Sequence, residues 1–136
     1  MNTEPEPEQF EEGGPDDRQR IGAQGEELAC GELVRLGYTI VERNKEIAGG
    51  ELDIIAEDGD VTAIVEVKTR IKGEVFRPSD ALTWHKARQI KKLAKMYLSS
   101  KGLLYKTLVR FDLAEVILAP GTLEPLEIRI SKRYFD

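Results

Sequence analysis

The stretch GELDIIAEDGDVTAIVEVKTR, residues 50–70, decides the fold around which the rest of the chain is organised. From residue 61 to residue 68, Val and Ala alternate with Thr, Ile, Glu and Lys. A period of two indicates a β-strand with one buried face. Asp58-Gly59 separates this run from an earlier β-rich run, and both residue types tolerate the positive φ angles of a tight turn. The stretch therefore predicts a β-hairpin.

The polar face of this hairpin carries Asp53, Glu66 and Lys68. If Glu57 pairs with Asp60, the two carboxylates lie diagonal to each other, and a loop two residues longer places them directly opposite. Opposite side chains lie about 5 Å apart and diagonal ones about 7 to 8 Å, so like charges at these positions repel each other. A divalent metal ion and Lys68 would supply the missing positive charge.

The length of 136 residues suits one domain. The net charge is −5, but residues 1–17 hold seven acidic and no basic residues, and the remainder has 20 basic against 18 acidic ones. This opening stretch also carries Pro and Gly and almost nothing apolar, so it cannot bury enough surface to offset the entropy of ordering. We expect a disordered acidic tail at 1–17 and a domain at 18–136.

The chain shows no basic start followed by an apolar run, and no apolar stretch approaches the roughly 18 residues of a membrane span. We therefore expect a cytoplasmic protein without a membrane partner. Cys30 is the only cysteine and His85 the only histidine. A single cysteine excludes an internal disulfide and multi-cysteine zinc sites, and the one histidine, which we expect on the surface, does not provide an adequate set of residues for His-dependent nuclease, zinc-hydrolase or Ser-His mechanisms. We expect Cys30 to be packed and His85 to be exposed, and Trp84 either stacks on a base or, as is commoner, lies in the core.

Hydrophobic periodicity places the other elements around the hairpin. Helices are predicted at 21–36 and from about 79 to 100, with Ser79 as the N-cap and Gly102 after the end. Further strands are predicted at 38–44, 108–118 and 126–130, with a mobile loop at 45–50. The order αβββαββ predicts an α/β domain in which a mixed sheet is flanked by helices.

Basic residues gather on the second helix and on the loop before it. The loop, residues 70–78, follows the Lys68 strand and also contains Phe76, which either stacks on a base or anchors the loop. Such cations could follow a phosphate backbone, or they could simply be a solvated face. The candidates for nucleic-acid contact are Arg70, Lys72, Arg77, Lys86, Arg88, Lys91 and Lys92.

An Asp and a Glu without histidine suit a hard cation such as Mg²⁺ or Mn²⁺, which keeps waters and phosphate oxygens beside one or two carboxylates. Such an ion can polarise a phosphoryl oxygen and activate a water molecule. Lys68 could orient or deprotonate that water and stabilise charge in the transition state. From spacing alone, an ordinary strand face with cross-strand Glu/Lys pairing is the favoured interpretation, because alternating charged strands are common.

Several motifs carry a resemblance that favours the catalytic interpretation. The matching segments are GAQGEELA at 22–29, GYTIVERN at 37–44, GGELDIIAEDGD at 49–60, VEVKTR at 65–70, the lysine-bearing helix around Lys86, and RFDL at 110–113. Together they resemble the PD-(D/E)xK nuclease superfamily and, within it, the YraN-type bacterial family. That family is regarded as endonuclease-like and related in fold to archaeal Holliday junction resolvases.

The resemblance implies a restriction-endonuclease-like core in which Asp53 and Glu66 are metal ligands and Lys68 is the catalytic lysine. Glu26, four residues after Gly22, corresponds to the helix glutamate that completes the acidic site. Glu51 would either support the metal ligands from behind or be structural. Leu52 stands where the superfamily usually has proline, a departure that the family tolerates. Arg110 and Asp112 match as well, as a buried supporting pair rather than as catalytic residues.

The leading hypothesis is thus a Mg²⁺- or Mn²⁺-dependent endonuclease that acts on DNA rather than RNA, with branched or single-stranded substrates among the candidates. The alternative is a nucleic-acid-binding module that keeps the nuclease fold without turnover. A protein-interaction role through the acidic tail ranks third. The sequence leaves the oligomeric state open, a homodimer included.

Overall fold

The computed structural model describes residues 15–75 and 81–136. Its elements are, in chain order, α1 (Pro15–Arg35), β1 (Thr39–Ile47), β2 (Gly50–Asp58), β3 (Val61–Ile71), α2 (Trp84–Ser100), β4 (Leu108–Leu118) and β5 (Pro125–Phe135). The predicted α/β class and the order αβββαββ are confirmed. The described residues contain no helix that is both long and apolar enough to cross a bilayer.

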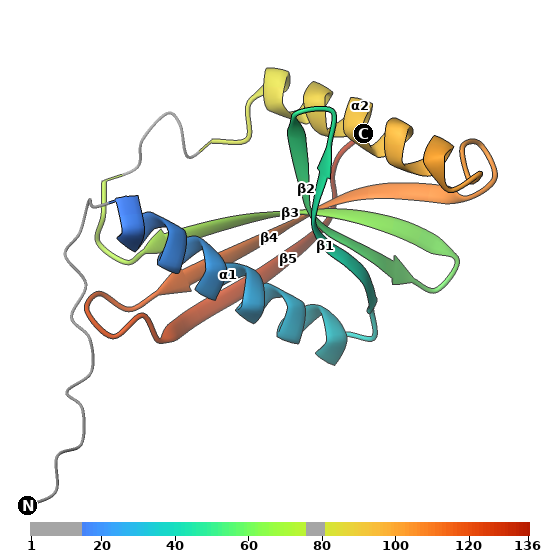
Figure 1. The fold of residues 1–136 in the computed structure, drawn as a ribbon. Helices are drawn as coiled ribbons and strands as arrows, with labels where there is room; N and C mark the ends of the chain where they lie inside the picture. The colour runs from blue at the N-terminus through green and yellow to red at the C-terminus, as the bar shows by residue number, and fades with distance from the viewer. Residues whose placement is uncertain (1–14, 76–80) are drawn as a thin grey trace, which may run out of the picture.

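The five strands form one mixed sheet in the order β1-β2-β3-β4-β5. Neighbouring strands run antiparallel except β3 and β4, which are parallel. Parallel neighbours need a crossover connection, and α2 supplies it. Figure 1 shows α1 and α2 on opposite sides of the sheet, with the β1–β2 hairpin bending toward α2.

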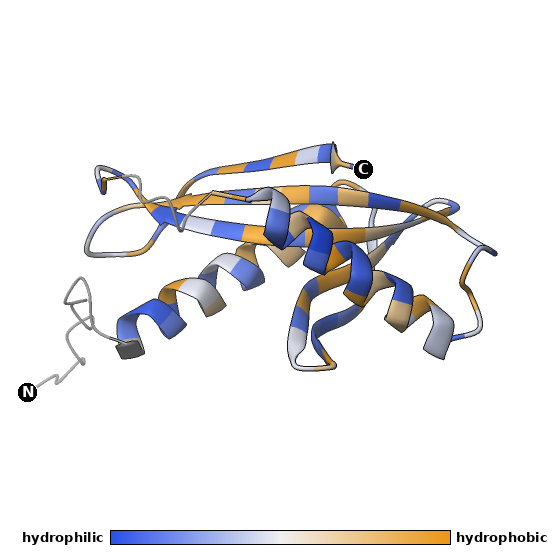
Figure 2. Ribbon diagram, turned by 90° about the horizontal axis from the view of Figure 1, so that it is seen from above, coloured by the Kyte–Doolittle hydropathy of each residue, from blue (hydrophilic) through white to orange (hydrophobic). Residues whose placement is uncertain are grey.

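Two hydrophobic cores hold these layers together. The core under α1 contains Leu33, Ile54 and Val65, and the core under α2 contains Ile64 and Leu93. Apolar and polar residues alternate along the strands, as the colours of Figure 2 show. The prediction that β3 has a single buried face is wrong for its middle, because residues 63–66 are all buried. Two helices cover the sheet from both sides there, so Glu66 is not on an open strand face.

Several predicted boundaries are wrong. Helix α1 begins at Pro15 and so includes residues 15–17, which the sequence assigned to the tail. Helix α2 begins only at Trp84, because Thr83 caps it through a hydrogen bond from the Lys86 N–H to its Oγ1 at 3.2 Å. The predicted loop at 45–50 is mostly strand, since pairing with β2 extends β1 to Ile47. Strand β5 is likewise longer, because β4 pairs with it out to Phe135.

The turn has two residues, as predicted, but it is Gly59-Asp60 and not Asp58-Gly59, and this shift gives the register predicted for a longer loop. Asp58 pairs with Val61, and Ile54 pairs with Val65. Continued by one residue, this register places Asp53 directly opposite Glu66. The hypotheses about residues 1–14, Phe76, Arg77 and Ser79 concern positions outside the described residues.

Candidate functional site

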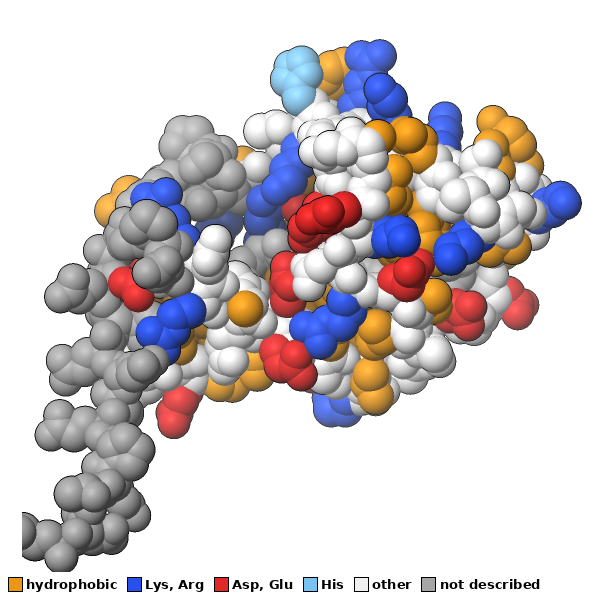
Figure 3. Space-filling view, viewed as in Figure 1, with side chains coloured by type: hydrophobic (Ala, Val, Ile, Leu, Met, Phe, Trp, Pro, Cys, Tyr) orange, Lys and Arg blue, Asp and Glu red, His pale blue; other side chains and the backbone are white. Residues whose placement is uncertain are grey.

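A cavity of about 390 Å³ lies where α1, β2, β3 and the start of α2 meet. It is lined by Glu26, Asp53, Glu66, Lys68 and Lys86, among others. Acidic and basic side chains meet in this hollow on the face seen in Figure 3. All four residues for which the sequence predicts catalysis are therefore brought together, although they come from three different elements.

Helix α1 delivers Glu26 to the cavity through a very close contact with β3. A Cβ atom built on Gly25 would lie 1.8 Å from Thr69 Oγ1, so only glycine allows the helix to approach the strand this closely. Glu26 is the next residue along the helix. In the sequence, Gly25 stands out only as part of the motif GAQGEELA, and no sequence pattern indicates its contact with Thr69.

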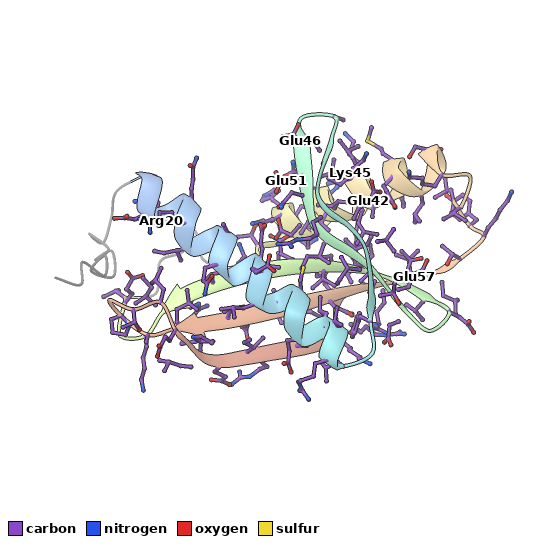
Figure 4. All side chains as sticks on the ribbon, turned by 60° about the horizontal axis from the view of Figure 1, so that its bottom comes forward. Arg20, Glu42, Lys45, Glu46, Glu51 and Glu57 are labelled. Atoms are coloured by element: carbon purple, nitrogen blue, oxygen red, sulfur yellow. The ribbon has the colours of Figure 1, made fainter. Side chains whose placement is uncertain are left out.

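The β1–β2 hairpin delivers a second acid in a similar way. A Cβ atom on Gly50 would lie 2.6 Å from Leu93 Cδ1, so the hairpin packs tightly against α2. Glu51 follows, on the side of the hairpin opposite Lys45 and Glu42 (Figure 4). Carboxylate oxygens of Glu26, Glu51 and Asp53 all lie within 4.8 Å of one another. The resemblance implied a supporting or structural role for Glu51, and the structure adds it to the acidic group.

Asp53 has a strongly altered acidity. Burial raises the pKa of its carboxyl group, and the nearby charge of Glu66 raises it further, to about 7. The backbone N–H of Val67 donates a hydrogen bond to Asp53 Oδ2 at 2.9 Å and partly opposes this effect. Burial also raises the pKa of Glu26, with a contribution from Glu51. The nearby positive charges therefore do not offset the effect of burial and of neighbouring acids on the pKa values of Asp53 and Glu26.

Glu66 differs from the other acids because two lysines reach it. Lys86 Nζ lies 2.9 Å and Lys68 Nζ 4.0 Å from the same oxygen, Oε1. The Glu66 side chain is only 6% exposed, so these ion pairs are shielded from water. Lys86 was predicted only as a nucleic-acid contact on the helix surface, yet it points into the acidic site.

The two lysines influence each other. Burial lowers the pKa of Lys68, and the adjacent Lys86 lowers it further. Burial alone would lower the pKa of Lys86 too, but its contacts with Lys68 and Glu66 outweigh that effect and raise it. Lys68 is therefore the lysine that gives up its proton more readily, which suits a group that must accept a proton during a reaction.

Asn44 is a site residue that the sequence analysis missed. Its side chain hydrogen-bonds to Glu26 and lowers the pKa of that carboxyl group. In the β1–β2 register, Arg43 pairs with Ile54 and Lys45 with Leu52, so Asn44 lies opposite Asp53. Its φ of 50° is left-handed, a conformation that Asn tolerates better than most residues. In the sequence, the presence of an Asn within a β-rich run is the feature that could have indicated this role.

The remaining basic candidates are divided between two places. Arg70 lines the cavity, whereas Lys72 is exposed outside its lining. Arg88 and Lys92 are exposed on α2, and Lys91 lies over the ring of Phe135 at 6.0 Å. Only the first turn of α2 therefore contributes directly to the cavity, through Lys86.

Arg110 and Asp112 form a separate buried network. Arg110 Nε donates to Asp112 Oδ1 at 2.8 Å, and the Tyr38 hydroxyl donates to Asp112 Oδ2 at 2.9 Å. Arg110 also donates to Asp58 at 2.8 Å. None of these residues lines the cavity described above. The sequence-based interpretation of a buried supporting pair is confirmed, and the network is larger than a pair.

The fold and this site define a class: a small α/β protein with an acidic, lysine-containing cleft on a mixed sheet. The family model described as "Uncharacterised protein family UPF0102" matches residues 25–116. The chain belongs to this family, which is the YraN-type family that the motifs indicated. The matched segment contains all the cavity acids and both lysines.

Similar proteins occur in distant bacteria. The chain is 39% identical over 100 residues to a UPF0102 protein of Dictyoglomus turgidum, an alignment covering 74% of this chain and 84% of that one. A relative from Nocardia farcinica is 42% identical over 105 residues, covering 77% and 82% of the two chains. One from Geobacter sulfurreducens is 46% identical over 101 residues, covering 74% and 78%.

Proposed function

We propose that this chain is a divalent-metal-dependent nuclease that cleaves phosphodiester bonds in DNA, through a catalytic domain spanning residues 18–136. The observation that carries the proposal is the cavity itself. Its lining includes Glu26, Asp53 and Lys68, a lysine of lowered pKa, and Glu51 brings a third carboxylate oxygen within 4.8 Å of those of Glu26 and Asp53. A purely structural cluster gains nothing from acids that repel one another.

The donor atoms fit Mg²⁺ or Mn²⁺. Among the described residues that line the cavity, none is His or Cys, and carboxylate oxygens are what hard cations prefer. Asp53 and Glu26 would hold the ion, with Glu51 or Glu66 completing the set. When bound, the ion would polarise the scissile phosphate and make a water molecule more acidic.

The lysines would act on the substrate. Lys68 is placed to accept a proton from the attacking water or to stabilise the extra negative charge that develops on the phosphate in the transition state. Lys86 would keep Glu66 in position through its ion pair and add positive charge beside the phosphate. Both functions need the lysines close to the acids, as the distances to Glu66 Oε1 provide.

The second candidate is a nucleic-acid-binding module without turnover. It is favoured by one observation, the engagement of Glu66 by both lysines, since a carboxylate neutralised in this way needs no metal ion. The two candidates differ in what the loss of Lys68 would do.

Lys68→Met tests the proposal on a panel of duplex, nicked, branched and single-stranded DNA with Mg²⁺ or Mn²⁺. We expect cleavage to fall by roughly 10²- to 10⁴-fold, the usual contribution of a positioned proton-transfer group. Affinity should change little, because one phosphate contact is lost among several. The matched control is Lys45→Met on the other side of the hairpin, which should cut like the wild type. A Lys68→Met protein that cuts at the wild-type rate would remove Lys68 from the mechanism.

The metal ligands can be tested without any nuclease assay. Mn²⁺ should stabilise the wild type by mass action and so raise its melting temperature. At a Mn²⁺ concentration of 100 times the dissociation constant, the free energy of unfolding should increase by about 2.7 kcal/mol. Asp53→Asn should abolish this response. Comparing Glu51→Gln with Glu66→Gln then shows which of the two completes the site. Equal responses from all four proteins would contradict a metal site here.

A further inference from the structure

Trp84 occupies an unusual position for the only tryptophan of the chain. It is the first residue of α2 and is 67% exposed. The sequence interpretation that favoured a core position is therefore wrong. The apolar stripe of α2 that faces the sheet includes Ile90, Leu93 and Tyr97, and Trp84 lies outside that stripe. A large aromatic ring that is exposed to water at this position is suited to contact a ligand.

One cation and a second aromatic ring contact this ring. The guanidinium carbon of Arg88 lies 5.3 Å from the centroid of the Trp84 ring, and His85 packs edge-on with centroids 5.1 Å apart. Helix α2 has no acidic residue from its first to its last position, and it carries five basic ones: Lys86, Arg88, Lys91, Lys92 and Lys95. Hydrophilic residues occur along α2 in Figure 2. This surface is therefore complementary to a polyanion that also offers a flat apolar face.

The ring and the candidate active site share one end of one helix. Lys86, two residues after Trp84, reaches Glu66 Oε1 at 2.9 Å. Two residues advance a helix by only about 3 Å along its axis. Two residues also turn a helix by about 200°, so Lys86 faces the cavity while Trp84 points to nearly the opposite side of the first turn, into solvent. A strand whose phosphate occupies the cavity can thus reach the ring by passing over the first turn of α2.

We propose that Trp84, backed by Arg88, is a stacking platform for an unpaired nucleobase, so that this protein holds nucleic acid in single-stranded form next to the cavity. The inference rests on the proposed nuclease function and specifies its substrate class. Stacking needs an exposed base face, which the interior of a duplex does not offer. Base stacking on an aromatic side chain contributes about 1 to 3 kcal/mol per base and accepts any sequence.

The experiment uses the intrinsic fluorescence of the full chain in metal-free buffer, where the single tryptophan reports on this position alone. The probes are an oligothymidylate, an abasic strand of equal length and a blunt duplex of equal length. We expect saturable quenching by the oligothymidylate. The abasic strand should bind through its phosphates without quenching, and the duplex should quench weakly.

Affinity measured by anisotropy of labelled strands completes the test. Trp84→Leu should weaken oligothymidylate binding by roughly 5- to 150-fold, the equivalent of the stacking energy, and leave abasic-strand binding unchanged. Trp84→Phe keeps a ring and should lose much less. Tyr105→Ala is the matched control, because Tyr105 is an aromatic residue that is 88% exposed elsewhere, and it should bind like the wild type.

Three results would overturn the platform. They are equal quenching by the abasic strand, equal affinity of the wild type and Trp84→Leu for oligothymidylate, and a fluorescence shift that depends on protein concentration alone. The last result would make this surface a contact between two copies of the chain. Each leaves the nuclease proposal standing if metal-dependent cleavage is found, whereas a wild type that binds no nucleic acid and cuts none refutes the proposed function itself.

Discussion

Two groups of charged side chains lie in this small domain, and they are built on opposite principles. In the network around Asp112, both carboxylate oxygens accept two hydrogen bonds each. The donors are Arg110 to both oxygens, the Tyr38 hydroxyl to Oδ2, and the backbone N–H of Arg133 to Oδ1. In the cavity, acids face acids, and the lysines concentrate on Glu66.

The acidities follow this difference. Hydrogen bonds from Arg110 and Lys132 lower the pKa of Asp58, which belongs to the network. Burial raises the pKa of Asp53 in the cavity to about 7. A structural network thus satisfies its charges internally, whereas Glu26, Glu51 and Asp53 lie together while the amino groups of Lys68 and Lys86 reach Glu66 instead. Unsatisfied charge in a concave site indicates function more strongly than charge itself.

The largest expected effect is in the network. Asp112→Asn replaces one acceptor oxygen by an NH₂ group facing donors and leaves Arg110 with Asp58 as its remaining carboxylate partner. We expect a loss of about 3 to 5 kcal/mol in the free energy of unfolding, as for other broken buried ion pairs. Urea denaturation measures it. A loss below about 1 kcal/mol would mean that the two groups do not differ in the way described.

Asp53→Asn should have the opposite sign. The folded protein keeps a proton on Asp53 up to about pH 7, whereas the unfolded chain releases it near the ordinary value of 3.8. Raising the pH through this window therefore destabilises the metal-free protein. The neutral variant escapes that cost, so it should be more stable than the wild type at pH 8, by at most about 4 kcal/mol at 1.36 kcal/mol per pKa unit.

The gain from Asp53→Asn should shrink as the pH falls and vanish near pH 4. Melting curves of both proteins at several pH values, recorded in chelator, test this. A gain in stability that does not depend on pH would show that the folded protein does not raise the pKa of Asp53.

The smallest expected effect is at Asn44, where two variants separate the contribution of the backbone conformation from that of the side-chain amide. Asn44→Ala must hold a left-handed φ at a cost of roughly 1 to 2 kcal/mol, which Asn44→Gly avoids. Both variants lose the amide that bonds Glu26 and should alter Mn²⁺ affinity to the same degree. Denaturation and Mn²⁺ titration of the pair measure the two contributions. If the two variants differ in Mn²⁺ affinity, the backbone rather than the amide positions Glu26.

Local patterns were sufficient for the framework. Alternation in residues 61–68 and the Asp58-Gly59 turn predicted the hairpin, and the face shared by Asp53 and Glu66 followed from parity alone. The two-residue turn lies one position later than predicted, which shifts each cross-strand partner by two residues and leaves the parity unchanged, so the shared face was predicted although the register was open. Helix starts were less accurate, because caps such as Thr83 compete with equally good candidates nearby in the chain.

The sequence by itself determined the α/β order, the hairpin and the family to which the chain belongs, since these depend on periodicity, turn chemistry and short motifs. Only the tertiary structure decided that Glu51 joins Glu26 and Asp53, that Lys86 turns inward to Glu66, and that Trp84 remains in solvent. These outcomes depend on how closely separate elements approach, as at Gly25 against Thr69 and Gly50 against Leu93. Distances between segments remote in sequence are set by packing, which no local pattern records.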